Sequence, residues 1–447
     1  MRIAVVGGGI GGLTAAHALV AAGIDAHVFE ALPRAGGVVG TSTADGFVRE
    51  HAASSFLGGP PRGALALCKQ LGVAVEQASP RASRRWIYLD GKLRALPRNP
   101  LELARSDLLT WRGKLELLRE PLRRTRGHDN GDESMHAFAA RRLGAEAARA
   151  IVAPFVTGVF AADAHDISLE AGFPRLAALE AQGGLVRGLA RQVARTAFAR
   201  VVGKRSSTTP RGLWAPRGGL GSLVDALARD LGTRVKLAMP IRKLAPDPRG
   251  VRVDDELWDG VVLAVPAQDA GALVVDIPDL TSRLAVFERA PTALVYLGYP
   301  AAAAPRAANG FGALVAAGEE ARVLGIVFES VVWPDRAPAG QVLLRCIFGG
   351  ARDRDALALD DAGLIAQATR DVAAVLGITG ATAHASVIRW TRGVAQYPVG
   401  HRDRVRAAVT AARTHRIVLA GADYRGPGIN DLCADADIVV DEVRAWG

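Results

Sequence analysis

A short apolar strand that turns through glycines into a helix limits the fold more than any other feature of this sequence. Residues 3–6 are apolar, Gly7-x-Gly9-x-x-Gly12 follows, and residues 13–23 have helical spacing. In such turns the glycines allow a tight turn, close approach of the backbone to phosphate, and close packing of helix on strand. The helix N-terminus also offers free N–H groups to a pyrophosphate. We therefore predict a Rossmann-type dinucleotide-binding domain whose pyrophosphate contacts are Gly7, Gly9, Ile10, Gly11 and Gly12.

The second strand indicates which nucleotide binds. Residues 25–30 end in Glu30, 18 residues after Gly12, where a carboxylate can accept hydrogen bonds from ribose hydroxyls. Arg34 and the doublet Gly36-Gly37 follow, so a second backbone segment can approach the pyrophosphate, although an ordinary glycine loop would look similar. This extension resembles the glycine doublet of FAD-containing amine-oxidase-like flavoproteins, and the resemblance implies FAD as the cofactor.

The end of the chain repeats the arrangement of its beginning. Residues 415–443 read as a strand, a glycine-rich loop and a helix. In the flavoproteins that this chain resembles, the last segment returns to the nucleotide domain and covers the isoalloxazine, where a helix N-terminus stabilises negative charge. Residues 217–232 and 235–244 look like the helix and strand that reach the adenine side, and 259–267 like a strand that rejoins the sheet. The expected contacts here are Ile241, Gly421, Gly428, Ile429 and Asn430.

Segments in the middle of the chain resemble the protoporphyrinogen oxidase family. They are residues 84–97, 133–180, 310–330 and 396–401. The resemblance implies oxidation of a porphyrinogen, most readily protoporphyrinogen IX, in three two-electron steps with dioxygen as acceptor and release of peroxide, within haem biosynthesis. It also implies a later enzyme of that pathway as a candidate partner.

The same resemblance implies the substrate contacts. Arg85 stands where the family has its propionate-binding arginine, and arginine is permanently charged and can bind a carboxylate with two hydrogen bonds. A solvated Arg85 is the alternative. The residues expected against the macrocycle, each of which could instead belong to the core or end a helix, are Phe155, Gly158, Phe311, Leu314 and Ile347. No nucleophile, paired carboxylates or metal cluster is evident, so we predict hydride transfer to flavin N5 without a catalytic side chain and without a metal.

Three departures from the family pattern leave other functions open. The chain has Ala52-Ala53 after Glu50-His51, Ala395 before Gln396-Tyr397, and Asp435-Ala436 in place of a small pair. All three fall near the expected flavin or pocket. An amine oxidase or desaturase on the same scaffold, or a tetrapyrrole-binding flavoprotein without enzymatic activity, therefore remains an alternative.

Charge and hydropathy suggest where the protein acts. The formal net charge is +10, which favours anionic partners. Residues 99–126 and 184–205 combine apolar side chains with many arginines, as amphipathic helices on anionic membranes do, although such helices can equally pack inward. No nucleic-acid-binding module appears, and nucleic acid is not expected. No signal peptide precedes the first strand and no apolar stretch reaches the roughly 18 residues of a spanning helix, so we expect a cytoplasmic protein, at most peripheral on the membrane face.

These patterns together predict an α/β architecture with a discontinuous nucleotide domain. The expected FAD-binding domain comprises residues 1–58, 206–272 and 388–447. A mixed-sheet substrate domain is expected from residues 80–97 and 273–387. Residues 98–205 should form a helical, membrane-facing lobe.

Overall fold

The structure is a computed structural model that describes residues 1–59, 62–126, 131–191, 210–304 and 309–446. The chain divides into two compact units, each described here by itself. The first comprises Met1–Ala78, Thr209–Arg289 and Arg402–Gly447. The second comprises Ser79–Thr208 and Ala290–His401, and it contains both the strands expected to bind substrate and the expected helical lobe.

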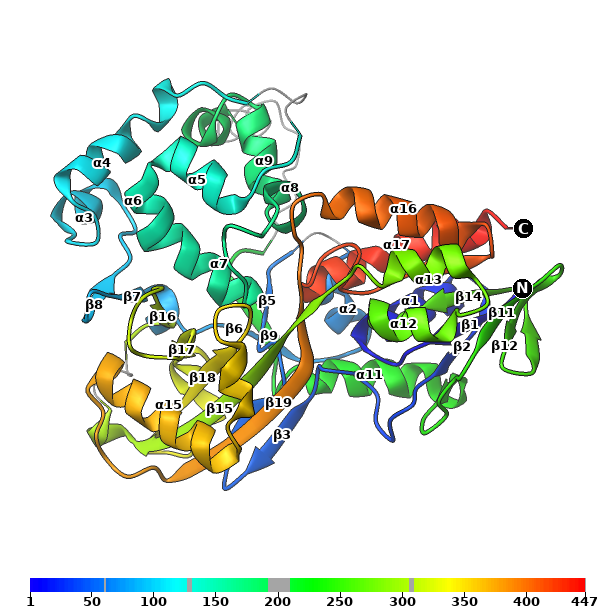
Figure 1. Ribbon diagram of the computed structural model, residues 1–447. Coiled ribbons are helices and arrows are strands. Elements are labelled where there is room, and N and C mark those ends of the chain that lie inside the picture. Colours follow the sequence, from blue (N-terminus) through cyan, green and yellow to red (C-terminus); the bar gives the residue numbers. More distant parts are fainter. Residues whose placement is uncertain (60–61, 127–130, 192–209, 305–308, 447) are drawn as a thin grey trace, which may run out of the picture. The chain divides into compact units, whose positions relative to one another are not determined.

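A five-stranded parallel sheet forms the centre of the first unit (Figure 1). Its strands, in spatial order, are β10 (Val235–Lys236), β2 (Asp25–Phe29), β1 (Arg2–Val6), β14 (Gly260–Leu263) and β20 (Ile417–Leu419). The strands thus come from the start, the middle and the end of the chain. The expected strand over 235–244 is regular only in its first two residues.

Both faces of this sheet are covered, which explains why its strands are apolar almost without interruption. Val28, Val5, Val262 and Val418 lie in one row across the sheet and pack beneath helices on one face. These helices are α1 (Ile10–Ala21), α2 (Ala64–Gln70), α11 (Gly221–Leu231) and α17 (Ile429–Arg444). The elements on the other face are α12 (Ala267–Leu273), α13 (Pro278–Leu284), α16 (His401–Arg413) and the antiparallel strands β11 (Leu244–Asp247), β12 (Gly250–Val253) and β13 (Glu256–Trp258).

Short strands complete the first unit. They are β3 (Thr41–Ala44) with β4 (Phe47–Glu50), and β5 (Phe56–Leu57) and β6 (Val75–Gln77) on either side of β9 (Leu213–Pro216).

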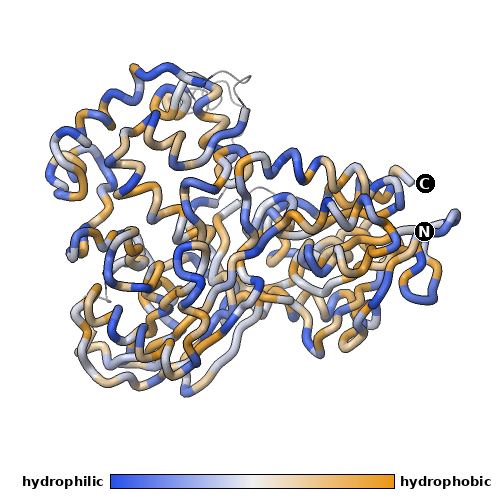
Figure 2. The backbone as a smooth tube through the Cα atoms, in the orientation of Figure 1, coloured by the Kyte–Doolittle hydropathy of each residue, from blue (hydrophilic) through white to orange (hydrophobic). Residues whose placement is uncertain are grey.

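The second unit is built on a mixed sheet of seven strands. In spatial order they are β19 (His384–Ala395), β15 (Arg289–Pro300), β18 (Gln341–Gly349), β17 (Gly325–Val327), β16 (Gly312–Val315), β7 (Arg85–Leu89) and β8 (Lys92–Ala95). The apolar face of α15 (Asp361–Leu376) covers one face of the sheet, over Ala313, Ile326, Cys346 and Val295. In Figure 2, which colours the backbone by hydropathy, hydrophobic segments of this unit include the central strands β18 and β17, while β19, β7 and β8 are more mixed and include arginine or lysine.

Short helices make up the rest of the second unit. They are α3 (Pro100–Arg105), α4 (Trp111–Leu118), the 3-10 turn η2 (Glu120–Leu122), α5 (Met135–Leu143), α6 (Ala145–Ala147), the π-helical turn η4 (Ala148–Val152), α7 (Ala153–Phe160), α8 (Leu169–Gly172), α14 (Glu329–Val332) and α9 (Pro174–Ala181). Ile87 and Leu89 of β7 pack against Leu108, Ala147 and Ala150 of this region. Among the described helices, none combines the length and apolar character needed to cross a bilayer. The predicted α/β fold, with a Rossmann-type domain, a mixed sheet and a helical region, is confirmed.

Candidate functional site

The turn between β1 and α1 has the properties of an anion site. Gly7 has a φ of +106°, and a Cβ on Gly12 would lie 2.0 Å from the Gly7 carbonyl oxygen, so the fold itself requires both glycines. Helix α1 has Gly9 as its N-cap, with no side-chain cap and no acidic residue in its first turn. The first N–H groups of a helix have no intrahelical partner, and the positive end of the helix dipole lies there.

Gly9 differs from its neighbours because the protein does not need a glycine there. Its φ is −66°, and the atom nearest to an added Cβ would be the Gly37 Cα, 4.0 Å away. A side chain would fit the protein, so the bare backbone leaves room for something else. The doublet lies alongside: the Gly36 N–H donates to the Gly8 carbonyl at 2.7 Å, and Arg34 Nη2 donates to the Gly37 carbonyl at 2.8 Å. Arg34 therefore also shapes this loop.

Glu30 is fixed at the end of β2. Its Oε2 accepts from the Gly8 N–H at 2.7 Å and its Oε1 from the Leu32 N–H at 2.8 Å. A carboxylate has about four acceptor sites, so lone pairs remain for ribose hydroxyls. The backbone carbonyl of Glu30 accepts a hydrogen bond from the Met239 N–H. Ile241, two residues after Met239, is half-buried.

The closing turn lies next to the opening one. A Cβ on Gly11 would be 3.4 Å from the Cα of Gly421, which follows β20 with a φ of +112°. Gly428 is the N-cap of α17, and Ile429 begins the helix in a buried position. The Asn430 side chain is engaged within the protein: Oδ1 accepts from the Ala64 N–H at 2.9 Å and Nδ2 donates to the Leu57 carbonyl at 2.7 Å. Its side chain joins α17 to α2.

Leu314 and Ile347, the residues on strands that were predicted to contact the substrate, share one face of the second unit's sheet. Across the strands the register places Ile87, Leu314, Gly325, Ile347 and Leu294 in one row. This row faces away from α15, since the residues that alternate with it form the core beneath that helix. Leu314 and Ile347 are half-buried, and between them lies buried Gly325, where an added Cβ would be 3.3 Å from Leu314 Cδ2.

Gly158 of α7 approaches the same row. A Cβ on it would lie 2.5 Å from Leu314 Cδ2. On that helix Phe155 is 47% exposed, with its ring centroid 5.9 Å from that of Phe173. The structure therefore brings Gly158, Leu314 and Ile347 together, with Phe155 on the exposed part of the same helix.

Arg85 is exposed at the start of β7, and its guanidinium carbon lies 5.3 Å from the centre of the Phe311 ring. Such stacking favours a cation over an aromatic face. The Phe311 N–H donates to the Arg84 carbonyl at 2.7 Å, which fixes this ring beside β7. Arg85 and Phe311 thus form a second group of predicted residues, and alternation along β7 puts Arg85 on the same sheet face as Ile87.

Three buried carboxylates near the cofactor turns were not predicted as site residues. Glu50 accepts from the Leu220 N–H at 3.0 Å and from Thr41 Oγ1 at 2.7 Å, at the start of α11. Asp435 accepts from the Gly421 N–H at 3.1 Å, and Asp423 accepts from the Ala267 N–H at 2.8 Å. Asp435 is one of the positions where the sequence departs from the family pattern, and Glu50 lies two residues before another such departure, Ala52-Ala53.

The first unit therefore has the features of a nucleotide-binding flavoprotein: an uncapped helix start, a second glycine segment, a carboxylate for ribose and a closing turn, all arranged around a space that the protein leaves open at Gly9. FAD fits this set of groups.

The chain belongs to the flavin containing amine oxidoreductase family, whose model matches residues 10–430. It is an FAD-dependent oxidoreductase. The chloroplastic protoporphyrinogen oxidase of Oryza sativa subsp. japonica is 30% identical over 438 residues, 91% of this chain and 81% of that protein. The coproporphyrinogen III oxidase of Bacillus subtilis (strain 168) is 25% identical over 463 residues, 97% of this chain and 96% of that protein. These relatives confirm the family resemblance seen in the sequence.

The crystal structure of a protein from Exiguobacterium sp. 255-15 has the same fold as this chain. Its TM-score is 0.83 at 23% identity, and the alignment covers 100% of this chain and 99% of that one.

Proposed function

We propose that the protein oxidises a porphyrinogen, most readily protoporphyrinogen IX, to the porphyrin with dioxygen as acceptor. The observation that carries this proposal is that relatives named for two porphyrinogen oxidations match 91% and 97% of the chain. The overall reaction removes six hydrogens: one porphyrinogen and three dioxygen give one porphyrin and three hydrogen peroxide. Bound FAD supplies the two-electron acceptor that dioxygen re-oxidises.

The described residues suit such a substrate. The row of Leu314, Gly325 and Ile347 offers an apolar surface, which suits a flat macrocycle. Arg85 is an exposed cation that lies over the Phe311 ring, and an arginine can bind a propionate with two hydrogen bonds. The residues would bind and orient the ring and exclude water. Conversion to an aromatic product supplies much of the driving force.

An amine substrate is less well supported. Such an enzyme would normally hold its substrate between aromatic rings near the flavin, and Tyr424 is the aromatic residue of the closing segment. Tyr424 is only 5% exposed, and its ring packs at 5.4 Å against Phe287 in the core of the first unit. The Tyr424 ring therefore packs in the protein core and is not available to hold a substrate.

The decisive experiment mixes the purified flavoprotein anaerobically with protoporphyrinogen IX and, separately, with coproporphyrinogen III. Loss of oxidised-flavin absorbance is expected with at least one of them, followed in air by porphyrin fluorescence and three peroxides per porphyrin. A simple amine serves as the control substrate. If neither porphyrinogen reduces the flavin, the proposal is refuted. Tight porphyrin binding without reduction would indicate a carrier instead.

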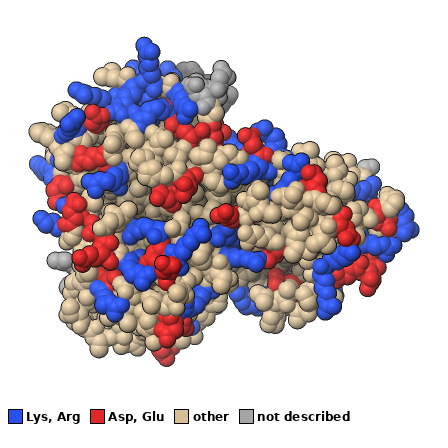
Figure 3. All heavy atoms as spheres, in the orientation of Figure 1, with Lys and Arg blue, Asp and Glu red and all other residues tan. Residues whose placement is uncertain are grey.

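We also propose that the protein works in the cytoplasm at an anionic membrane face. Apolar side chains on α3, α4 and η2 are unusually exposed: Leu101 60%, Trp111 71%, Leu115 52%, Leu118 65% and Leu122 79%. The last four follow helical spacing, so they form one stripe. Exposed Arg112, Arg119 and Arg124 flank it, and Figure 3 shows basic side chains gathered over the segment that follows α4. A bilayer with anionic headgroups matches both properties.

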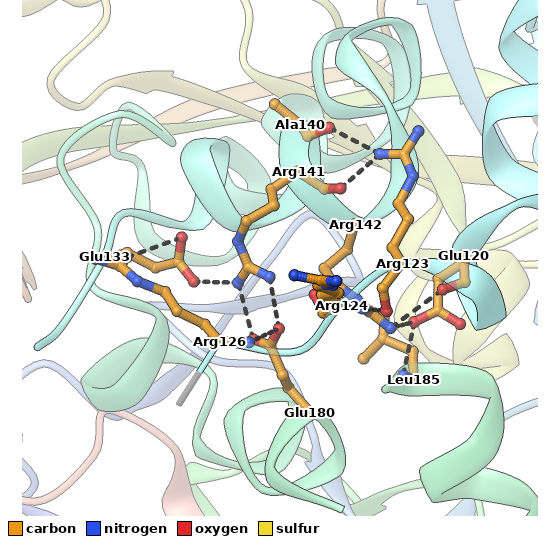
Figure 4. A network of polar contacts seen from close by, with 10 residues as sticks. All are labelled: Glu120, Arg123, Arg124, Arg126, Glu133, Ala140, Arg141, Arg142, Glu180 and Leu185. Atoms are coloured by element: carbon orange, nitrogen blue, oxygen red, sulfur yellow. Dashed lines mark hydrogen bonds and ion pairs between the residues drawn. The ribbon is translucent and has the colours of Figure 1, made fainter. Parts of the chain in front are cut away.

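A buried ion pair connects this stripe to a second exposed segment. Glu120 of η2 forms an ion pair with Arg142 and accepts from the N–H group of Leu185 at 2.8 Å (Figure 4). It also accepts from the N–H group of Val186 at 3.2 Å. Val186 and Leu189 are 53% and 54% exposed. Glu120 thus places the start of the basic segment 184–205 close to Leu122. Residues 192–205 of that segment lie outside the described residues.

A further inference from the structure

Two buried carboxylates lie at the closing turn of the cofactor site. Asp435 accepts the N–H of Gly421, and Asp423, two residues after that glycine, accepts the N–H of Ala267 at the start of α12. Each is only 3% exposed. Two potential negative charges therefore lie beside Gly421, which itself lies beside Gly11 in the first turn of α1.

Each carboxylate has an arginine partner. Arg289 binds Asp423 with two hydrogen bonds, Nε to Oδ1 at 2.9 Å and Nη2 to Oδ2 at 2.9 Å. Arg425 forms an ion pair with Asp435 and a second one with Glu442 at 3.0 Å, and Glu442 also pairs with Arg413 at 2.8 Å. Burial raises the pKa of Asp435, and the charge of Arg425 opposes that rise. Arg289 thus balances the charge of Asp423, and Arg425 with Arg413 balances the charges of Asp435 and Glu442.

This compensation matters because the cofactor carries a pyrophosphate. The first turn of α1 attracts an anion through its free N–H groups. An uncompensated carboxylate at the adjoining turn would repel the same anion, and charges in a poorly solvated place are weakly screened. The two arginines keep the closing turn neutral without removing the carboxylates that fix its backbone.

We propose that Arg289 and Arg425 are positioning residues for FAD, which neutralise Asp423 and Asp435 so that the closing turn can lie against an anionic cofactor. The inference depends on FAD as the cofactor and not on the porphyrinogen. Its test measures FAD binding to apoprotein and leaves turnover aside, so its failure and a failure of the proposed function can be told apart.

The experiment determines the FAD Kd by flavin fluorescence for R289Q, D423N and the double variant R289Q/D423N. We expect R289Q to weaken FAD binding at least tenfold, D423N to weaken it less, and the double variant to recover most of the loss. The same order should hold for R425Q, D435N and their combination. Arg322→Gln is the matched control, since Arg322 binds Asp353 with two hydrogen bonds in the second unit, and it should leave the FAD Kd unchanged.

Salt and a conservative variant separate repulsion from a merely structural role. Repulsion is screened by salt, so the difference in FAD Kd between R289Q and the wild type should become smaller at high ionic strength. R289K keeps the charge and should stay within about threefold of the wild-type affinity, which also keeps the test valid if R289Q does not fold. The proposal is overturned if R289Q behaves like R322Q, if the double variant is no better than R289Q, or if R289K loses affinity tenfold.

Discussion

Gly11 in the first helix and Gly421 in the last glycine turn are in contact: a Cβ on Gly11 would lie 3.4 Å from the Cα of Gly421. These residues belong to opposite ends of the sequence. Their contact explains why the chain has a glycine-rich turn at both ends, because the two turns border one nucleotide site. At Gly421 itself the φ of +112° favours glycine, whereas the space would admit a Cβ, since its nearest contact outside the adjoining residues would be the Ala264 carbonyl oxygen at 4.0 Å.

Gly9 and Gly12 should respond differently to alanine. Gly9→Ala adds a Cβ where no protein atom lies closer than 4.0 Å, so the apoprotein should change in stability by no more than about 1 kcal/mol, the usual range for an N-cap change. Its FAD Kd should rise about tenfold, since the methyl group would occupy cofactor space.

Gly12→Ala places its Cβ 2.0 Å from the Gly7 carbonyl oxygen and should cost about 1–3 kcal/mol or more of unfolding free energy. Urea titration and flavin fluorescence measure both quantities. Equal destabilisation by the two variants would contradict the assignment of Gly9.

Arg85→Ala should raise the KM for the porphyrinogen about tenfold, the effect of losing one charge-assisted hydrogen bond. Flavin content should stay the same, because Arg85 belongs to the second unit. Arg85→Lys keeps the charge but loses the planar fork, so its KM should fall between those of the wild type and the alanine variant. Steady-state kinetics with a porphyrinogen checks this, and an unchanged KM in R85A would remove Arg85 from the substrate site.

Glu120 should contribute to stability in a pH-dependent way. Burial opposes its ionisation, yet the N–H groups of Leu185 and Val186 and the Arg142 guanidinium hold the pKa of Glu120 below its usual 4.5. A carboxyl with a depressed pKa in the folded state stabilises the fold above its unfolded pKa. That contribution is lost as the pH falls below 4.5 through the folded pKa.

Glu120→Ala should therefore lower the unfolding free energy at neutral pH by about 3–5 kcal/mol, since it leaves Arg142 buried without this partner. Urea titrations between pH 7 and acid pH should show a flatter acid dependence for this variant than for the wild type. Glu102→Gln, at an exposed pair with Arg98, should change stability little. Parallel pH curves for E120A and the wild type would show that the pKa of Glu120 is the same in the folded and the unfolded protein, which would contradict this prediction.

The exposed stripe predicts binding to anionic vesicles. Replacing Trp111, Leu118 and Leu122 together by serine should reduce co-sedimentation with phosphatidylglycerol vesicles at least tenfold and leave flavin content unchanged, because these side chains are largely exposed. Binding should weaken with salt and be poor on phosphatidylcholine alone. Triple replacement of exposed Val275, Val286 and Val399 by serine is the control. Self-association that disappears in the stripe variant, without vesicle binding in the wild type, would indicate a second copy of the chain as the partner instead.

Local sequence patterns indicated the residues of the cofactor turns. They did not indicate the side-chain contacts that hold the closing turn and α17 in place. The role of Gly7, Gly12 and Glu30 follows from a strand, a turn and a helix that are close in sequence. The partners of Asp423 and Asn430 lie far along the chain, at Arg289 and near Ala64. Short-range spacing contains no information about such pairs. The role of the Asn430 side chain between α17 and α2 could therefore not be read from the sequence, and the expected cofactor contact of Asn430 stays a prediction.

The residues predicted to contact the substrate show the same limit of short-range sequence patterns. Leu314 and Ile347 were each compatible with an ordinary core position, and only strand register brings them into one row with Gly325 between them. Register depends on which strands pair, which periodicity along one strand does not determine. Their assignment from the sequence came through family resemblance, and it stays a prediction until substrate binding is measured.

The order of strands in the first unit has a consequence for biosynthesis. Because β20 completes the sheet beside β14, while β1 lies on the other side of β14, the ribosome must extend the chain past Leu419 before this sheet can close. Contacts over such sequence separations form slowly, and the nascent chain meanwhile exposes the apolar edge of β14. We therefore expect the cell to load FAD only after the closing turn has been synthesised, with chaperones protecting that edge until then.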